Sequence, residues 1–570
     1  MKYSQLPFKT TKTIAKDLQS KNSRLLTQAG YIHKEIAGVY TFLPLGLRVL
    51  NKIEAIIREE MDTISAELFM PSLAPIAHWE KTKRFHSVDV LMKTTPANEK
   101  ARLKNDTEYV LSPTHEDMVT PLVQEFVHSY KDLPVAVYQI QTKFRNEPRA
   151  KSGLLRCREF RMKDLYSFHM NEEDLKRYYE IVKEVYFRVF EKLGLKHGLF
   201  LTLASGGDFT KDYSHEFQVV CDAGEDIIFH VKSKNLTFNR EVAPSMAPTM
   251  DQHDEEEKPL AEIEGVGMIG VEEVAKHIGI TVEQTTKTLL FEDENHHIIA
   301  ATVRGGYDVN EEKLQKIAGV GSLTLASAET VKKVTGAEVG YAGLLNLPKD
   351  VKIFMDESLK GRRNFEMGAN KTGFHSMNVN FGRDLPEPET FYDLKTAKEG
   401  DKYPETGEVY EVYKAAEVGN IFPLNVKFSE SFGFTYIDEK GQKMPIYMGS
   451  YGIGPSRVMG VIVEKFADEK GLIWPHNIAP YTVHLISLNA HDKAGMLYKT
   501  LEQEGVEIFY DDRGNASAGE KFADADLMGM PVRLVISGKT GDSVEWKERG
   551  KENSELISVE EVITRLKRAH

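Results

Sequence analysis

The feature that most constrains the fold is a pair of strand-like segments on either side of a cationic loop. Residues 135–144, VAVYQIQTKF, alternate in polarity, and RCREFRMKDLYSFHM follows the loop PRAKSGLL. Two such segments joined by a polar loop predict an antiparallel hairpin. Seven of the 21 residues from 144 to 164 are Lys or Arg, although the chain carries a formal net charge of -13. The concentration of positive charge in this hairpin predicts a site for an anion.

The spacing within the hairpin suggests what the anion is. Side chains two residues apart on a strand share a face, so Arg145 and Glu147 are expected together. Arg156, Phe160 and Asp164 are expected to follow one another on the same face of the second strand. Guanidinium groups bind phosphate, a carboxylate accepts from an exocyclic amine, and an aromatic ring stacks on a base. The pattern favours a nucleotide site, with a solvated, charge-rich hairpin as the alternative.

The length and local composition of the chain predict several domains. At 570 residues it is too long for one core. An acidic stretch at 250–259, a turn-rich stretch at 398–408 and WPHNIAP at 474–480 are the candidate boundaries. Segments after the last boundary alternate as β-α-β-α-β, which predicts a small α/β module.

The charge is also unevenly spread. Residues 231–410 hold 31 Asp/Glu and 21 Lys/Arg, and the remaining 390 hold 55 and 52. A near-neutral remainder can present local basic faces to a polyanion, so the totals argue against a histone-like binder but do not exclude nucleic acid. Two cysteines without a CxxC pair predict neither a disulfide framework nor a zinc site. No signal-like segment or 18-residue apolar run is seen, so a cytoplasmic protein without a membrane partner is expected.

A second stretch, YMGSYGIGPSRVMG at 447–460, is rich in small residues and contains Arg457. It lacks GxxxxGK[ST], so it is not a phosphate-binding P-loop. It is typical of a strand that runs into a helix and whose glycines let another group approach the backbone. A tight strand–helix joint without a ligand is the alternative interpretation.

Together these residues resemble a known family. Arg145-Asn146-Glu147 with Arg156, Phe160 and Asp164 resembles motif 2 of class II aminoacyl-tRNA synthetases, and GIGPSR resembles motif 3. The amphipathic segment 45–64 with ELFMP and Pro71 resembles motif 1, the dimer element. SPTHED at 112–117, LLRCREFRMKDLYSFH, YGIGPSR and the C-terminal YDDRGNASAGEKFADADLMGMPVRLVIS are similar to the prolyl-tRNA synthetase family, and the likeness spans almost the whole chain.

The resemblance implies an α/β multidomain fold. It consists of a class II antiparallel-sheet catalytic domain, an inserted mixed α/β editing domain of the bacterial form, and a C-terminal α/β anticodon-binding domain. The expected divisions are 1–229 and 409–473 for the two catalytic parts, 230–408 for the insertion and 474–570 for the anticodon-binding domain.

The implied reaction is ATP-dependent ligation of proline to tRNA(Pro) through prolyl-adenylate, releasing AMP and pyrophosphate. ATP with Mg²⁺ is the implied cofactor, and no protein-held metal is expected. By resemblance, the catalytic residues are Arg145 and Arg457. The ATP-binding residues are Arg145, Glu147, Arg156, Phe160 and Arg457. The proline-binding residues are Thr114, Glu116, Arg145, His169, Ser450 and Gly452.

A proline pocket cannot exclude the smaller alanine sterically, since each missing methylene discriminates by only about 1–3 kcal/mol. Hydrolytic editing of alanyl-tRNA(Pro) is therefore implied. The matching insertion residues are Lys287, Asp356 and His375. The stretches RGGYD at 304–308 and AGLLNLPKD at 342–350 depart from the family's usual wording. A surface position for Lys287 and a turn position for His375 are the structural alternatives.

The last domain implies binding of unpaired anticodon bases, whose edges carboxylate and basic side chains can read. Asp512, Arg513, Glu545 and Lys547 are the candidates, and a solvated turn at 511–513 is the alternative. A homodimer is implied, and DNA is not expected as a partner. Two rival functions stay open: a class II synthetase for another amino acid such as threonine, and a non-catalytic tRNA-binding paralogue. The absence of an evident zinc-binding Cys/His set opposes the first, and the presence of Arg145, Arg156 and Arg457 opposes the second.

Overall fold

The computed structural model describes residues 1–13, 18–150, 152–207, 209–210, 214–248, 250, 252 and 254–568. The chain forms two compact units. The first unit comprises Met1–Leu201, Gly206–Glu225 and Lys414–His570, and the second comprises Thr202–Ser205 and Asp226–Tyr413. No helix among the described residues is long and apolar enough to cross a bilayer.

The first unit is built on a sheet that contains the predicted hairpin. β7 (Val135–Phe144) and β8 (Glu159–His169) pair antiparallel from Val135↔Phe168 to Phe144↔Glu159 without a register shift, which confirms the hairpin. The sheet continues from β8 through β23 (Tyr447–Ile453) and β20 (Glu411–Asn425) to β10 (Ser214–Val220), all antiparallel. At the other edge, the short β3 (Ala66–Glu67) is parallel to β7.

The hairpin strands end before the residues that were expected to share their face. β7 stops at Phe144, and the Glu147 N–H bonds the Arg145 carbonyl at 2.7 Å, which turns the chain out of the strand. Arg156 likewise precedes the start of β8. Alternation along a strand therefore does not fix the directions of Arg145, Glu147 or Arg156.

Two long helices pack on one face of this sheet. α2 (Pro44–Met61) begins with Pro at its first position, where the missing N–H would have no helical partner. α6 (Glu172–Lys192) begins at Asn171, whose side chain accepts from the Asp174 N–H at 2.9 Å. Their buried apolar stripes join residues of β8 and β23 in the largest core. These caps and stripes are the local reasons why the predicted helices form.

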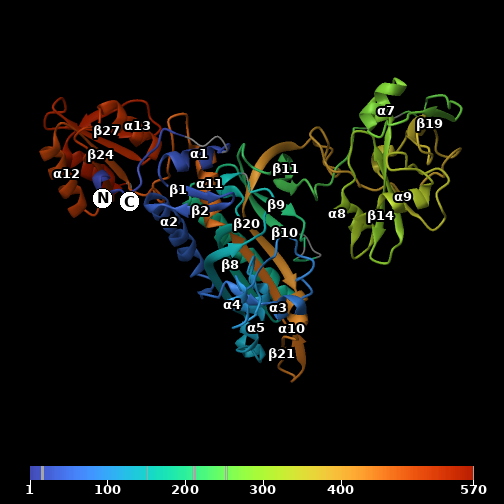
Figure 1. Ribbon diagram of the computed structural model, residues 1–570, viewed down its shortest axis with the longest axis horizontal. Helices are drawn as coiled ribbons and strands as arrows, with labels where there is room; N and C mark the ends of the chain where they lie inside the picture. The colour runs from blue at the N-terminus through green and yellow to red at the C-terminus, as the bar shows by residue number, and fades with distance from the viewer. Residues whose placement is uncertain are drawn as a thin grey trace. The chain divides into compact units, whose positions relative to one another are not determined.

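The C-terminal module is coloured red in Figure 1. Its sheet has the order β25-β24-β26-β27-β28, and β24 is parallel to both β25 and β26. This confirms the β-α-β-α-β prediction. Its elements are β24 (Val483–Leu488), α12 (His491–Gln503), β25 (Ile508–Asp511), α13 (Ala518–Met528), β26 (Val532–Ser537), β27 (Val544–Glu548), β28 (Glu555–Ile557) and α14 (Val559–Arg568).

The second unit contains two small sheets. One has the order β16-β14-β15-β17 and the other the order β13-β19-β18. Apolar residues of both sheets share one buried cluster. The elements are β13 (Ala261–Glu264), α7 (Val271–Ile278), β14 (Thr286–Asp293), β15 (Ile298–Arg304), α8 (Glu311–Ala318), β16 (Leu323–Leu325), α9 (Ala328–Thr335), β17 (Lys352–Met355), β18 (Phe365–Gly368) and β19 (Phe374–Val379).

Shorter elements complete the chain. Those before the hairpin are α1 (Lys21–Gln28), β1 (Ile32–Ile36), β2 (Val39–Phe42), β4 (Leu73–Pro75), α3 (Ile76–Lys81), β5 (Met92–Thr94), α4 (Glu99–Arg102), β6 (Tyr109–Leu111) and α5 (Glu116–Gln124). Those after it are β9 (Leu199–Ala204), β11 (Asp226–Val231), β12 (Leu236–Asn239), α10 (Lys427–Phe432), β21 (Thr435–Ile437), β22 (Lys443–Pro445) and α11 (Pro455–Phe466).

Candidate active site

A buried carboxylate lies at the start of α5. Glu116 is 1 % exposed, and its two oxygens accept from different hydroxyls. Thr114 donates to one at 2.5 Å and Ser450 of β23 donates to the other at 2.9 Å. Arg84 lies 3.7 Å from the same carboxylate. Three of the predicted proline-binding residues are thus in direct contact, around a negative charge that suits a small ammonium ion.

The predicted ATP-binding arginines lie near the same sheet. The Arg145 guanidinium lies over the Phe160 ring, 5.3 Å from its centroid. Arg457, in the first turn of α11, donates to Glu417 at 2.8 Å and to the Leu155 carbonyl at 2.9 Å. Burial lowers the pKa of Arg145, and the nearby charge of Arg457 lowers it further. Two cations held this close to one another favour an anion between them.

Glu147 and Arg156 also meet, as an ion pair of 2.7 Å. Arg156 reaches a second carboxylate, Glu225, at 3.0 Å. Four of the motif 2 residues thus meet as two pairs: Arg145 with Phe160, and Glu147 with Arg156.

His169 is not brought into this cluster. Because the β7–β8 ladder has no register shift, odd-numbered residues of β8 face the side opposite to Phe160. His169 bonds Asp174 at 2.8 Å and packs against Tyr178 of α6. Burial lowers the pKa of His169 despite the Asp174 partner. Its position corrects its expected place in the proline pocket and supports a structural role.

Tyr166, which the sequence reasoning missed, occupies the place expected for His169. It is directly paired with Ser450 across β8 and β23, and Asp164 is paired with Gly452. A Cβ on Gly452 would lie 2.6 Å from Met162 Cε and 2.7 Å from Asn420 Oδ1, so the ends of both side chains would have to move to admit a larger residue. Counting alternation from Phe160 along the strand would have favoured Tyr166 over His169.

The predicted editing residues of the second unit have separate partners. Lys287 Nζ lies 2.6 Å from Asp308. His375 is buried, with Nδ1 2.7 Å from Glu366 Oε1 and Nε2 3.0 Å from the Met268 carbonyl. Burial alone would lower the pKa of His375, but the Glu366 hydrogen bond and charge outweigh it, so the pKa is raised. Glu366, nine residues before His375, had no sequence signal of its own.

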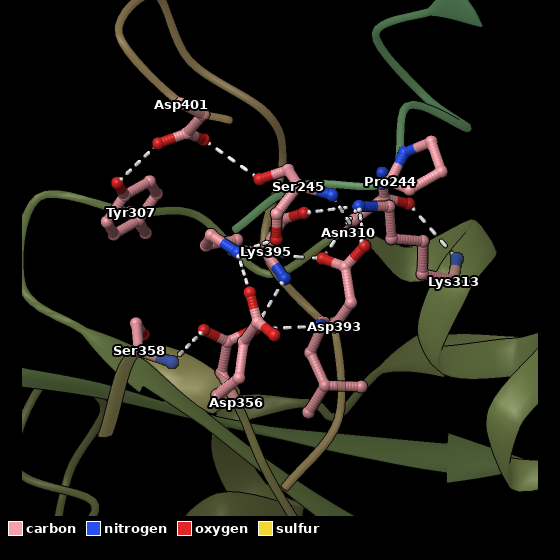
Figure 2. Close-up of polar contacts among 12 residues, drawn as sticks. Pro244, Ser245, Tyr307, Asn310, Lys313, Asp356, Ser358, Asp393, Lys395 and Asp401 are labelled. Atoms are coloured by element: carbon pink, nitrogen blue, oxygen red, sulfur yellow. Dashed lines mark hydrogen bonds and ion pairs between the residues drawn. The ribbon is translucent and has the colours of Figure 1, made fainter. Parts of the chain in front are cut away.

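Asp356 is fully buried and saturated with backbone donors (Figure 2). One oxygen accepts from the Ser358 N–H at 2.9 Å. The other accepts from the N–H groups of Leu394 and Lys395 at 2.7 and 2.9 Å. Asp356 therefore fastens the segment around Lys395 to the end of β17. No contact with Lys287 or His375 is seen among the described residues.

Two of the four predicted anticodon residues have structural partners. Asp512 accepts from the N–H and hydroxyl of Ser4 at 2.9 and 2.6 Å. Arg513 bonds Asp511 at 2.7 Å and Asp524 at 2.8 Å. The Asp512 contacts, together with the Arg513 guanidinium that lies 3.8 Å from the centroid of the Tyr3 ring, secure the N-terminal segment, whose end lies beside the C-terminal module in Figure 1. The pair does not form the free base-reading edge that the sequence suggested.

Lys547 instead lines a cavity of about 250 Å³ in the C-terminal module, and Glu545 is not among the lining residues. Arg533 and His484 line the same cavity, and the Arg533 guanidinium lies over the Phe522 ring, 4.6 Å from its centroid. Both ring nitrogens of the buried His484 lack a hydrogen-bond partner, and burial lowers its pKa to about 4. The cavity thus combines cations with carboxylates and an unsatisfied polar ring, with an aromatic ring nearby. The carboxylates are Asp468, Asp526, Glu548 and Glu552, of which Asp468 precedes the C-terminal module.

Comparison with known proteins identifies the family. A model of the tRNA synthetase class II core domain (G, H, P, S and T) matches residues 100–466, and an anticodon binding domain model matches 478–569. A proline–tRNA ligase of Geobacillus kaustophilus is 38% identical over 575 residues, covering 100% of this chain and 99% of the relative. One of Thermoanaerobacter pseudethanolicus is 39% identical over 576 residues, with the same coverage.

Two solved structures share the fold. Prolyl-tRNA synthetase from Cryptosporidium parvum, complexed with halofuginone and AMPPNP, has a TM-score of 0.57 and 14% identity, covering 97% of this chain and 78% of that one. Prolyl-tRNA synthetase of Giardia lamblia, in complex with prolyl-adenylate, has a TM-score of 0.56 and 15% identity, covering 95% and 74%. The full-length identity to curated enzymes, the two matched domains and the shared fold show that this chain belongs to the proline–tRNA ligases, a family of class II aminoacyl-tRNA synthetases.

Proposed function

We propose that this enzyme activates proline with ATP and transfers it to tRNA(Pro), with the first unit as the synthetic site. The proposal rests on a buried carboxylate and two neighbouring arginines that lie near the same sheet. Glu116 offers a negative charge for the ring ammonium of proline, and Arg145 and Arg457 offer positive charge for carboxylate and phosphates. The relatives' printed names and the prolyl-adenylate complex of the Giardia enzyme support it.

The chemistry follows from this arrangement. The proline carboxylate attacks the α-phosphorus of ATP, and pyrophosphate leaves. Arg145 would neutralise charge that grows on the α-phosphate while it holds the attacking carboxylate, because such preorganised donors act most strongly on developing charge. Arg457 and Arg156 would hold the β- and γ-phosphates, and Phe160 would stack on adenine beside Glu147. The tRNA ribose hydroxyl then attacks the acyl carbonyl and AMP leaves.

Mg²⁺ would enter with the triphosphate. Among the described residues no group of three or more His, Cys, Asp or Glu side chains could hold a metal ion. Mg²⁺ commonly keeps water and phosphate oxygens as ligands and needs only one or two protein carboxylates. The ion would screen phosphate repulsion, while the arginines of this chain position the nucleotide.

Amino-acid-dependent ATP–pyrophosphate exchange tests the synthetic function. We expect strong exchange with proline and weaker exchange with alanine, because the smaller side chain loses only part of the apolar contact. Threonine and cysteine are measured in parallel. Strong exchange with threonine would favour the rival synthetase, and no exchange with any of the four would favour the tRNA-binding paralogue.

We also propose that the second unit hydrolyses alanyl-tRNA(Pro), with His375 as its principal residue. Both partners of the imidazole are acceptors: Nδ1 donates to the Glu366 carboxylate and Nε2 donates to the Met268 carbonyl, so the two contacts together favour the protonated imidazolium, which would act on the ester as a hydrogen-bond donor and acid. Lys287, 31 % exposed at its side chain, is available to a phosphate of the acceptor end if its Asp308 pair opens. Asp356 would contribute by supporting the framework rather than by touching the ester.

For the anticodon, we propose that the cavity beside Lys547 and Arg533 receives a base of tRNA(Pro). Lys547→Ala is expected to weaken tRNA binding by about 10- to 100-fold, since a good base contact contributes about 1–3 kcal/mol. Proline-dependent pyrophosphate exchange, which needs no tRNA, should be unchanged. Lys539→Ala, an exposed lysine of the same module outside the cavity lining, is the control. Equal tRNA affinity of both variants would contradict the assignment.

We further propose a homodimer through the segment around Pro71. Phe69 is 83 % exposed, and Leu73 is also exposed. On α5 and just after it, Leu122 and Phe126 are exposed as well. Exposed large apolar side chains on a segment of this kind are typical of a protein contact surface. Sedimentation of the wild type against Phe69→Asp would separate a dimer from a monomer.

A further inference from the structure

A closed ring of buried polar groups lies next to the loop 112–117, called here the amino-acid loop because it carries Thr114 and Glu116. Lys143 of β7 and Asp164 of β8 form an ion pair of 2.7 Å, and the lysine side chain is fully buried. The same ammonium donates to His115 Nδ1 at 2.5 Å. Tyr166 closes the ring, because its hydroxyl donates to Asp164 at 3.2 Å and accepts from the His115 backbone N–H at 3.0 Å. Lys143 thus bonds both Asp164 and His115, which Tyr166 also connects.

The ring contacts favour one tautomer of His115, in which the Gln141 amide nitrogen, itself a donor, lies 3.3 Å from the protonated Nε2. An ammonium can only donate, so Nδ1 is the acceptor and Nε2 carries the proton. Nε2 lies 3.0 Å from the Pro71 carbonyl, to which it donates. Burial, and then the charge of Lys143, lower the pKa of His115 to about 3, which keeps the imidazole neutral.

Gln141 also holds the segment that accepts the His115 hydrogen bond. Its amide accepts from the Met70 N–H at 3.0 Å and donates to the Met70 carbonyl at 2.9 Å. The backbone of Met70 and Pro71 is therefore held to β7 by Gln141 and to the amino-acid loop by His115. Phe69 and Leu73, the exposed residues on either side, belong to the face proposed for the dimer.

His115 stands between Thr114 and Glu116, the two loop residues of the proposed proline subsite. Any shift of the His115 ring or backbone must move the Glu116 carboxylate. We propose that Lys143 is a positioning residue for proline: it holds Asp164 and His115 so that the loop 112–117 presents Glu116 to the substrate ammonium, and it joins that loop to the Met70–Pro71 segment. This rests on the proposed proline-activating function.

Lysine is suited to this place for a physical reason. Its compact ammonium offers three donors at the end of a flexible stem, and two are used on Asp164 and His115. Without it, the buried Asp164 carboxylate would lose its 2.7 Å ion-pair partner and be left with the more distant charges of Lys163 and Arg145, and His115 Nδ1 would lose its donor. Both changes act directly on the loop, whereas neither Lys143 nor His115 makes a hydrogen bond to Arg145 or Arg457 among the described contacts.

The test is Lys143→Met, which keeps the apolar stem and removes the ammonium. In proline-dependent pyrophosphate exchange we expect the KM for proline to rise about tenfold or more, the scale on which outer-shell partners act, and the KM for ATP to change less than twofold. Lys163→Met is the matched control. Lys163 is equally buried one strand away, but it faces α6 and bonds Tyr186 and the Tyr451 carbonyl. The Lys163→Met variant should have a lower Tm than the wild type and an unchanged KM for proline.

A double variant distinguishes a specific effect on proline binding from a general loss of stability. Lys143→Met with Asp164→Asn removes both buried charges, so the Tm should recover relative to the single variant. The raised KM for proline should remain, while Lys143→Arg, which keeps a donor cation, should restore part of the affinity. Parallel rises of both KM values, or an unchanged KM for proline in the single and double variants, would overturn the positioning role of Lys143 and leave the proposed proline-activating function standing. A wild-type enzyme without proline-dependent exchange would overturn the proposed function and this proposal with it.

Discussion

Arg145→Ala should reduce proline-dependent pyrophosphate exchange by about 10²–10³-fold or more, the loss seen when a single preorganised donor to a developing charge is removed. Arg145 is the guanidinium that lies over Phe160 and is close enough to Arg457 for the two charges to interact. Its removal takes away the group proposed to hold the α-phosphate and the attacking carboxylate together. Initial exchange rates over a range of ATP and proline concentrations measure the effect.

The control is Arg149→Ala, an exposed arginine in the same loop. It should leave exchange within about twofold of the wild type, because surface charges contribute little at physiological ionic strength. Arg145→Ala should also bind tRNA(Pro) almost normally, since the cavity beside Lys547 is built from other elements. Equal losses of exchange and tRNA binding in Arg145→Ala would count against the division of labour between the domains.

His375→Ala should still charge tRNA(Pro) with proline but clear alanyl-tRNA(Pro) about 100-fold more slowly, within the range that a positioned acid or base contributes. The imidazole is the only part of this residue that contacts Glu366 and Met268, and both contacts are lost in the variant. Deacylation of purified alanyl-tRNA(Pro) measures the effect. Clearance at the wild-type rate would show that His375 is not the editing residue.

Two variants sharpen this test. His277→Ala removes an exposed histidine of α7 in the same unit and should leave deacylation unchanged. Glu366→Gln keeps a hydrogen-bond partner but removes the charge that helps to hold the pKa of His375 above its usual value. Because the pKa should then fall, any step of deacylation that depends on His375 titration should move to lower pH. An identical pH profile in both enzymes would contradict the role assigned to Glu366.

Local patterns predicted the elements of the fold well. The β7–β8 hairpin follows from alternation on both sides of a polar loop, and α2 (Pro44–Met61) follows from the amphipathic segment 45–64. The β-α-β-α-β order of the C-terminal module also follows from short-range periodicity. In each case the signal lies within about one element's length, so a single sequence contains it.

Individual site residues were harder to predict. Thr114, Glu116 and Ser450 come together as the resemblance implied, although 334 positions separate Glu116 from Ser450. His169 was assigned by resemblance to the family, but its odd-numbered position in β8 turns it toward α6. In a strand, neighbouring residues face opposite sides, so a motif without a counted register does not choose a side.

The sequence alone determined the order of the synthetase motifs, the secondary structure around them and the family to which the chain belongs. Only the tertiary structure decided that Asp512 and Arg513 secure the N-terminal segment, that Asp356 is saturated by backbone donors, and that Lys143 joins His115 to Asp164. The physical reason is that a polar side chain's role depends on which donors and acceptors surround it once it is buried. Those partners come from distant parts of the chain, and no local spacing records them.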